Sequence, residues 1–306
     1  MESLNDTKKR IKSVQSTRQV TKAMEVVSAT KMRKSQDSAL KARGYAFSAF
    51  ELLANLDKYE SKMKKPALFV RPKGAKKTLL IVVASDKGLA GSLNSNVLKK
   101  ALTWRQAEMQ KGEIDLIVAG KKARDFFKFR NVAIKKHFFG HGDFADFDEV
   151  QDLTEFLKLE FLSGEYARVV MIYTNFRSTL KQEAVVREVL PLKEKGLLQM
   201  VEGLVPEKGK RSEMKDLKVR TQDYLFEPSP EKVFEELTYR LFQMMMYHVI
   251  LESNASEHSA RMVAMKTASE NAQEIADDLT LIYNKGRQAK ITQELVEITS
   301  ASDAIQ

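Results

Sequence analysis

Residues 231–285 read EKVFEELTYRLFQMMMYHVILESNASEHSARMVAMKTASENAQEIADDLTLIYNK and contain neither glycine nor proline. Such a run is typical of a helix, because glycine and proline are the residues that interrupt one. A 4-3 spacing of apolar and small residues runs through it to Gly286, which indicates a coiled-coil seam. The seam comprises Leu237, Leu241, Met244, His248, Leu251, Ala255, His258, Met262, Met265, Ser269, Ala272, Ala276, Leu279, Tyr283 and Gly286. We expect one helix from about residue 231 to about residue 300.

The amino-terminal end of the chain predicts a second long helix. Residues 1–43 are also free of glycine and proline, and the pattern extends the helix from about residue 4 to about residue 57. At 1.5 Å per residue the two helices would be about 80 Å and about 105 Å long, too long for a compact domain. Because the middle of the second seam is built of small residues, the backbones of the two helices can approach closely, and each helix is the expected partner of the other.

The amino-terminal seam is less regular than the carboxyl-terminal one. Its apolar residues drift around the helix, which favours a short and weakly supercoiled pair. These residues are Ile11, Val14, Val20, Met24 and Val27. Since the middle of the chain joins the end of one helix to the start of the other, the pair must be antiparallel. The second helix is then about 25 Å the longer, and its last turns, in 289–306, should project alone.

Between the helices lies the pattern of a parallel α/β domain. Apolar, β-branched runs at 78–84, 114–119 and 167–173 alternate with helical stretches near 96–110, 121–129 and 148–162, and 184–190 adds an edge strand. The polar stretch 196–222 indicates a surface loop or a disordered insertion. The expected fold is a long antiparallel coiled coil of the terminal helices with an inserted Rossmann-like parallel α/β domain. The expected domains are 1–65, 66–228 and 229–306.

Composition restricts the classes of protein to which the chain can belong. The 306 residues include no cysteine, which excludes disulfides, thiolate zinc sites and thiol redox switches. No window approaches the roughly 18 uninterrupted apolar residues of a membrane span, and the first ten residues lack the apolar run of a signal peptide. The net charge of +10 indicates an acidic partner, which could be nucleic acid, an anionic membrane surface or an acidic protein.

A glycine-containing turn, SDKGLAGSLN at 85–94, follows the first expected strand. Neither the dinucleotide fingerprint nor the phosphate loop fits the spacing of Gly88 and Gly91. We therefore interpret the segment as a tight strand-to-helix turn in which Asp86 or Asn94 acts as a cap. The sequence offers no serine–histidine–acid set and no paired carboxylates, so we expect no catalytic site and no cofactor.

Positive charge is concentrated in the first helix. Residues 8–34 hold nine basic residues and one acidic residue, a net charge of +8, whereas 231–306 hold seven basic and twelve acidic residues. A nucleic-acid-binding coiled-coil protein is therefore an alternative, although the aromatic residues that would interleave the basic ones are absent from 8–34.

The four histidines give no metal site. His137 and His141 have the spacing of metal ligands but lie among phenylalanine and glycine with no carboxylate between them. His248 and His258 lie on the seam, where packing or the setting of register is the simpler role.

Four stretches together resemble the gamma subunit of F-type ATP synthases, and the resemblance covers nearly the whole chain. They are the helix IKSVQSTRQVTKAMEVVSATKMRK at 11–34, the turn at 85–94, and the segments ASEHSARMVAMKTAS at 255–269 and LIYNKGRQAKITQELVEIT at 281–299. The family implies a rotating shaft whose coiled coil stands inside a hexamer of alpha and beta subunits. Its α/β foot rests on the epsilon subunit and on the membrane rotor ring of c subunits. Membrane association is then indirect, at the cytoplasmic face of the bacterial plasma membrane, and no nucleic acid is bound.

The resemblance also implies which residues contact the alpha and beta subunits. They are Lys22, Met24, Lys31, Arg33, Lys34, Arg261, Arg287, Gln288, Thr292 and Glu294. This chain departs from the family pattern at Lys87 and Ala90, where arginine and cysteine are commoner, and at Gly286, where alanine is commoner. A glycine in a helix costs about 1 kcal/mol relative to alanine, so a hinge at Gly286 is an open alternative to a straight helix. The regulatory cysteine pair of the plant-type subunits is absent.

Overall fold

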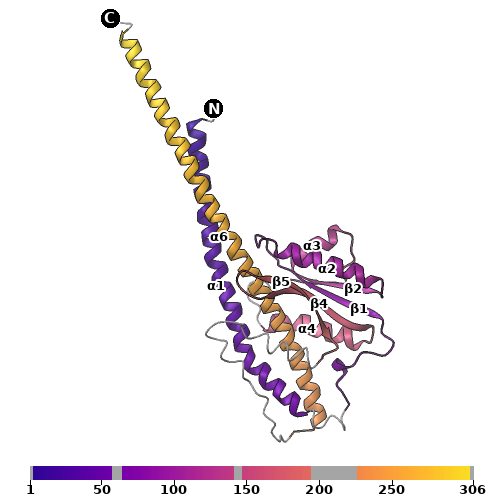
Figure 1. Cartoon of the computed structure of the whole chain (residues 1–306). Helices are drawn as coiled ribbons and strands as arrows, with labels where there is room; N and C mark the ends of the chain where they lie inside the picture. Colours follow the sequence, from indigo (N-terminus) through magenta and orange to yellow (C-terminus); the bar gives the residue numbers. More distant parts are fainter. Residues whose placement is uncertain (1–2, 57–63, 141–146, 194–225, 304–306) are drawn as a thin grey trace. The chain divides into compact units, whose positions relative to one another are not determined.

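The computed structural model describes residues 3–56, 64–140, 147–193 and 226–303. The terminal helices are α1 (Leu4–Leu56) and α6 (Pro230–Asp303). Within the described residues between them lie the 3-10 turn η2 (Ala67–Phe69), five strands and three helices (Figure 1). The chain divides into two compact units, one of residues 1–28 and 261–306 and one of residues 29–260. The helical pattern of both chain ends and the inserted α/β domain are thus confirmed.

The first unit is an antiparallel pair of helical segments, one from α1 and one from α6 (Figure 1). The side chain of Leu4, the first residue of α1, lies against Gly286 of α6, with Leu4 Cδ2 only 3.0 Å from where a Cβ on Gly286 would stand. Because α6 continues to Asp303, 17 residues beyond Gly286, its end runs past α1 by about 25 Å. The projecting end expected from the helix lengths is confirmed.

The seam of α1 is more regular than its apolar residues indicate. A set of buried or half-buried residues follows a 3-4 spacing that is interrupted only at the exposed Arg18, and many members of this set are small or polar. They are Leu4, Thr7, Ile11, Val14, Thr21, Glu25, Ser28, Met32 and Ser35. The prediction that Val20 and Val27 belong to the seam is wrong, because these side chains are 56% and 53% exposed. The predicted seam residues Ile11, Val14 and Met24 are half-buried. The small and polar seam residues do not stand out in an apolar pattern, because close helix packing selects them.

The second unit contains a five-stranded sheet of order β3-β2-β1-β4-β5. Strands β1 (Lys77–Val83), β2 (Ile114–Ala119), β3 (Lys136–Phe138) and β4 (Tyr166–Phe176) run parallel. β5 (Gln182–Leu190) pairs antiparallel with β4 at the edge. The sequence pattern predicts three of the parallel strands and the edge strand, whereas the three-residue β3 is too short for its pattern to stand out.

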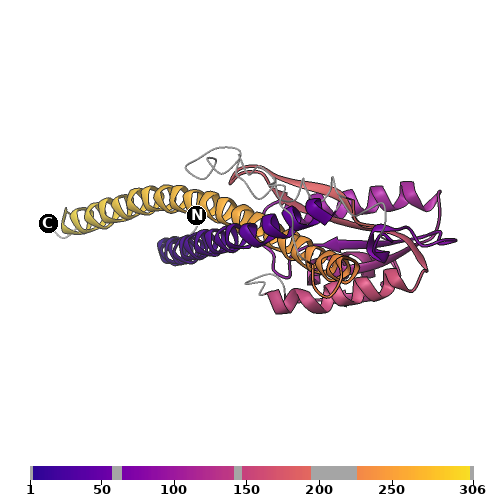
Figure 2. The same ribbon diagram turned by 90° about the horizontal axis from the view of Figure 1, so that it is seen from below.

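Both faces of the sheet are covered, which explains the continuous apolar runs of β1, β2 and β4. Helices α2 (Leu93–Met109) and α3 (Lys121–Phe129) cover one face around Val97, Ala123 and Phe127. The other face packs against α4 (Phe147–Leu162) and the 237–251 segment of α6. The α/β unit therefore uses part of a terminal helix as one of its own layers, and Figure 2 shows this helix passing beneath the sheet.

Polar side chains fix α6 against the sheet as well as apolar ones. Tyr173 of β4 donates a hydrogen bond to Glu252 at 3.0 Å, and Ser256 donates to the carbonyl oxygen of Thr174 at 3.2 Å. His248 and His258 are buried, as expected of packed seam residues.

Among the described residues no helix is both long and apolar enough to cross a membrane. The stretch 196–222 and His141 lie outside the described residues.

Candidate partner-contact surface

The predicted contact residues of the first unit lie on two helices. Lys22 on α1 is exposed and its ammonium group lies 3.0 Å from Glu25, while Met24 is half-buried. The contact residues near the end of α6 are all exposed, and the hydroxyl of Thr292 donates to the carbonyl oxygen of Gln288 at 3.0 Å. These exposed residues are Arg287, Gln288, Thr292 and Glu294.

Arg261 differs from the other residues of the predicted set. Its side chain is only 6% exposed, and it has an interaction partner within the chain. A buried guanidinium group is held by internal partners, because desolvation without them is costly. A direct contact between Arg261 and another subunit would therefore require its side chain to leave this environment.

The basic cluster of α1 that belongs to the second unit consists of Lys31, Arg33 and Lys34. Arg33 and Lys34 are exposed and Lys31 is half-buried. Long, exposed cations of this kind form ion pairs worth about 0–1 kcal/mol each, which favours contacts that can be made and broken repeatedly.

The first unit also exposes large apolar side chains, which the predicted contact set does not include. On the first unit, Val26 is 57% exposed, Leu281 is 71% exposed and Ile282 is 57% exposed, besides Val20 and Val27. Large exposed apolar surfaces mark sites of interaction with other proteins. The signal for these residues is present in the sequence, because Leu281 and Ile282 fall off the 4-3 spacing of the α6 seam.

Gly286 is a packing position within a continuous helix. α6 shows no break there, and a Cβ at this position would meet Leu4 Cδ2 at 3.0 Å, closer than an ordinary van der Waals contact. Glycine thus lets the first turn of α1 approach α6. The structure gives no support to a hinge.

We expect the effect of Gly286→Ala to depend on Leu4. In the Leu4→Ala background the substitution should raise the free energy of unfolding by about 1 kcal/mol, the gain in helix propensity. With Leu4 present, crowding should remove most of that gain. Thermal unfolding of the four chains, followed by circular dichroism, measures the coupling. Equal gains in the two backgrounds would contradict the packing role.

The turn at 85–94 is closed by its own side chains. The backbone N–H of Ser85 donates to Asn94 Oδ1 at 3.1 Å, and Gly91 has φ +55°, a conformation that favours glycine. Asp86 accepts from the backbone N–H of Lys121 at 2.8 Å and from that of Gly140 at 3.1 Å. The prediction that Asp86 or Asn94 caps the helix directly after the turn is wrong, because α2 has no hydrogen bond to a capping side chain. Asp86 caps α3 instead.

The carboxyl ends of β1 and β4 are the position where open α/β sheets usually bind ligands, because the strand order reverses there. In this chain α6 is hydrogen-bonded to that end of β4, and Asp86 occupies the N-terminus of α3, where a phosphate would otherwise bind. Gly88 does not have a left-handed φ, and a Cβ added to it would meet only the end of the Lys122 side chain within 4 Å. No cluster of metal-binding side chains occurs in the part of the chain that the structure describes.

Comparison with known proteins agrees with this architecture. The family profile described as ATP synthase matches residues 3–305. The ATP synthase gamma chain of Chlorobaculum parvum is 36% identical, with 100% of this chain and 99% of the relative covered. That of Pelotomaculum thermopropionicum is 37% identical, with 100% of both covered. The chain belongs to the ATP synthase gamma chain family.

Solved structures share the fold at lower sequence identity. A chain from the Euglena gracilis mitochondrial ATP synthase, in a structure of its OSCP, F1 and c-ring, has a TM-score of 0.61 at 16% identity, covering 99% of this chain and 94% of that one. A chain from the central stalk and c-ring of the Tetrahymena thermophila mitochondrial ATP synthase has a TM-score of 0.57 at 23% identity, covering 82% and 99%.

Proposed function

We propose that the chain is the rotating central shaft of an F-type ATP synthase. It couples proton flow through the membrane rotor to ATP synthesis or hydrolysis on the beta subunits, and has no catalytic site of its own. The observation that carries the proposal is the first unit, a helix pair with exposed apolar side chains and a helix end that outruns its partner. In a family of ATP synthase gamma chains, a surrounding ring of subunits accounts for both features.

The proposed partners follow from the family. The related structures are described as a central stalk with a c-ring and as F1 with a c-ring. For this chain we propose a hexamer of alpha and beta subunits around the first unit and around the start of the second unit at Lys31, Arg33 and Lys34. We propose an epsilon subunit and a ring of c subunits against the α/β part of the second unit. The chain then associates with the membrane only through the rotor, at its cytoplasmic face. The same family membership argues against nucleic acid as the partner of the basic residues.

The proposed contact set has two parts with different chemistry. The basic part consists of Lys22, Lys31, Arg33 and Lys34, with Met24 among them. The carboxyl-terminal part consists of Arg287, Gln288, Thr292 and Glu294. Arg261 remains in the set, but because its side chain is buried, its contribution requires either a change of conformation or an effect exerted through its neighbours.

An asymmetric shaft explains how rotation and catalysis are coupled. Each of three catalytic sites meets a different face of the shaft, so the angle of the shaft sets which conformation each beta subunit favours. Rotation then changes nucleotide affinity at sites that the shaft does not touch, and nucleotide hydrolysis drives the reverse movement. The weak, exposed ion pairs of the basic part suit a surface that must pass from one subunit to the next.

The absence of catalysis in this chain is part of the proposal. The turn at 85–94 matches neither phosphate-binding motif, its Ser85, Asp86 and Asn94 side chains bind the chain itself, and α6 occupies the end of β4. Hydrolysis of ATP by the purified chain alone would contradict it. Elution of the chain together with alpha and beta subunits as an ATPase complex is the direct test of the proposed partnership.

Reversing the basic cluster should uncouple the complex without unfolding the chain. In Lys31→Glu, Arg33→Glu, Lys34→Glu we expect normal circular dichroism but several-fold fewer protons pumped per ATP hydrolysed, because three contacts with acidic beta-subunit loops become repulsive. The measurement is proton pumping and ATP hydrolysis by the assembled complex in vesicles.

The matched control changes exposed lysines of α2 in the second unit. Lys99→Glu, Lys100→Glu alters the charge in the same direction at positions outside the proposed contact set. If the cluster variant assembled and pumped protons at the normal ratio per ATP, the contact role of the basic cluster would be wrong.

A further inference from the structure

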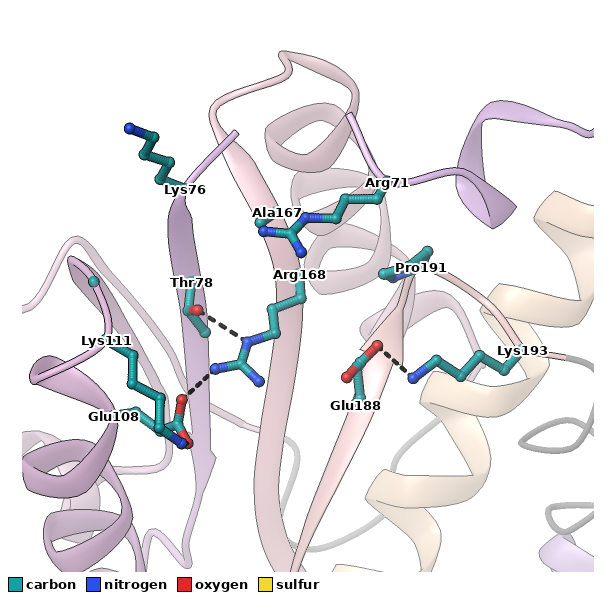
Figure 3. Close-up of a pocket in the computed structure, with 11 residues that line it drawn as sticks. Arg71, Lys76, Thr78, Glu108, Lys111, Ala167, Arg168, Glu188, Pro191 and Lys193 are labelled. Carbon is teal, nitrogen blue, oxygen red and sulfur yellow. Dashed lines mark hydrogen bonds and ion pairs between the residues drawn. The ribbon is translucent and has the colours of Figure 1, made fainter. Parts of the chain in front are cut away.

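A cationic pocket lies in the second unit, away from the turn at 85–94. Its volume is about 430 Å³, and it is lined by residues at the amino ends of β1 and β4, the carboxyl end of β5 and the end of α2 (Figure 3). This size is within the range of pockets that bind small molecules. Five of its lining residues are basic and two are acidic, so the lining carries a net positive charge.

The two acidic residues are already used by nearby cations. Glu108 forms an ion pair with Arg168 and another with Lys111 at 2.8 Å. The hydrogen bond from Lys111, with a contribution from Arg168, lowers the pKa of the Glu108 carboxyl below its ordinary value. Glu188 lies 2.9 Å from Lys193. Neither carboxylate neutralises Arg71, whose hydrogen bond within the pocket goes to a backbone carbonyl oxygen, that of Ala75 at 3.4 Å.

Arg168 is held in place as a ligand-binding group would be. Its Nε donates to the hydroxyl of Thr78 at 3.1 Å, one terminal nitrogen binds Glu108, and the guanidinium group lies 5.8 Å from the centre of the Trp104 ring. Figure 3 draws no interaction for the other terminal nitrogen, and it shows Arg71 reaching over β4 beside Ala167. A fixed guanidinium group is preorganised for an anion with several oxygen atoms.

The dipole of α2 accounts for only part of this arrangement. The carboxyl end of a helix attracts cations, which explains Lys111 and Arg168 beside the end of α2. It does not explain Arg71, which comes from the segment before β1 on the other side of the pocket (Figure 3). Two arginines that line one pocket, in which both lining carboxylates are already paired with other cations or with Arg168, are suited to an added anion.

We propose that this pocket binds a small anion carrying phosphoryl groups, held between Arg71 and Arg168. A planar guanidinium group donates paired hydrogen bonds to phosphoryl oxygens, and Lys111 adds a flexible charge at the rim. The site is separate from the surfaces proposed to contact alpha and beta subunits, so its occupancy does not depend on the proposed rotary function.

The test is calorimetric titration of the full chain with pyrophosphate at fixed ionic strength. We expect one saturable site, with binding weakened at least about tenfold by Arg71→Gln, since a hydrogen bond to a charged group is lost. Arg168→Lys keeps the charge but loses the paired geometry and should also weaken binding. Circular dichroism confirms that each variant is folded. Lys73→Gln, which removes an exposed cation from the same loop outside the pocket, should bind as the unaltered chain does.

Two further titrations compare related anions at the same site. Orthophosphate tests a single phosphoryl group and ADP tests a nucleotide, and each should compete with pyrophosphate for the same site. Unsaturable binding of pyrophosphate, or equal weakening by Arg71→Gln and Lys73→Gln, would show a general attraction to positive charge and overturn the proposal.

Discussion

Replacing Gly120 by alanine should destabilise the second unit by more than about 4 kcal/mol, the range of the most severe single substitutions. Gly120 has φ +101°, and a Cβ at this position would lie 1.9 Å from the carbonyl oxygen of Ala84 and 2.8 Å from its carbonyl carbon. These atoms belong to the backbone at the end of β1. They cannot move independently, because the N–H of Ala84 donates a hydrogen bond to the carbonyl oxygen of Ala119 at 2.9 Å. The measurement is the melting temperature and soluble yield of the full chain.

Substitution of a second glycine distinguishes the effect of the steric clash at Gly120 from the effect of a positive φ alone. Gly164 has φ +82°, but a Cβ added there would have nothing within 4 Å, so Gly164→Ala should cost only about 1–2 kcal/mol. A large difference between the two variants is the expected outcome. Similar, small losses of stability in both would show that the end of β1 moves freely, and that the contact at Gly120 does not constrain the turn.

The architecture could be predicted from the sequence wherever one residue pattern determined an element. The 4-3 spacing of α6 predicted a seam whose residues are all buried or half-buried, and the apolar runs predicted the three long parallel strands. Length arithmetic alone predicted the projecting end of α6. In each case one regular backbone conformation, helical or extended, continued over many residues.

The remaining features depend on contacts between distant segments. The seam of α1 uses Thr7, Ser28 and Ser35, which look like surface residues until a neighbouring helix covers them. Asp86 caps α3 across 35 positions of sequence, a partnership that no local motif encodes. The same holds for the cationic pocket, where Arg71 and Arg168 come together only because β1 and β4 are neighbours.

For the contact surface, residue identities could be predicted from the sequence but their exposure could not. Resemblance to the family selected Arg261 together with exposed residues, although its side chain is buried. Conversely, Leu281 and Ile282 are exposed and lie outside the 4-3 spacing of the α6 seam, but the family motif does not select them as contact residues. Exposure is therefore the information that the structure adds to this surface.

Truncation of the chain before Gly286 should weaken assembly with alpha and beta subunits by at least about a hundredfold, whereas truncation after Ser300 should be tolerated. Ile291, Leu295, Val296 and Ile298 are all exposed on a helix end that has no partner in the described part of α1. Each such side chain contributes about 1.5–3 kcal/mol when it is fully buried by a partner, so losing four outweighs any loss at the frayed terminus. Torque measured in the assembled complex should fall together with assembly.

A second variant keeps the full length of α6 but removes the apolar side chains of its projecting end, so it distinguishes an effect of helix length from an effect of apolar contact. Replacing the same four residues by glutamine preserves helix propensity and length, and should reproduce most of the loss if the tip is an apolar bearing that keeps the shaft centred. Limited proteolysis then locates the contact. In the free chain, cleavage within 289–303 should be rapid, because every side chain from 287 to 300 is exposed and no described segment covers it. In the complex the same bonds should be protected, whereas equal cleavage in both states would reject the bearing and leave the projecting end as a solvated terminus.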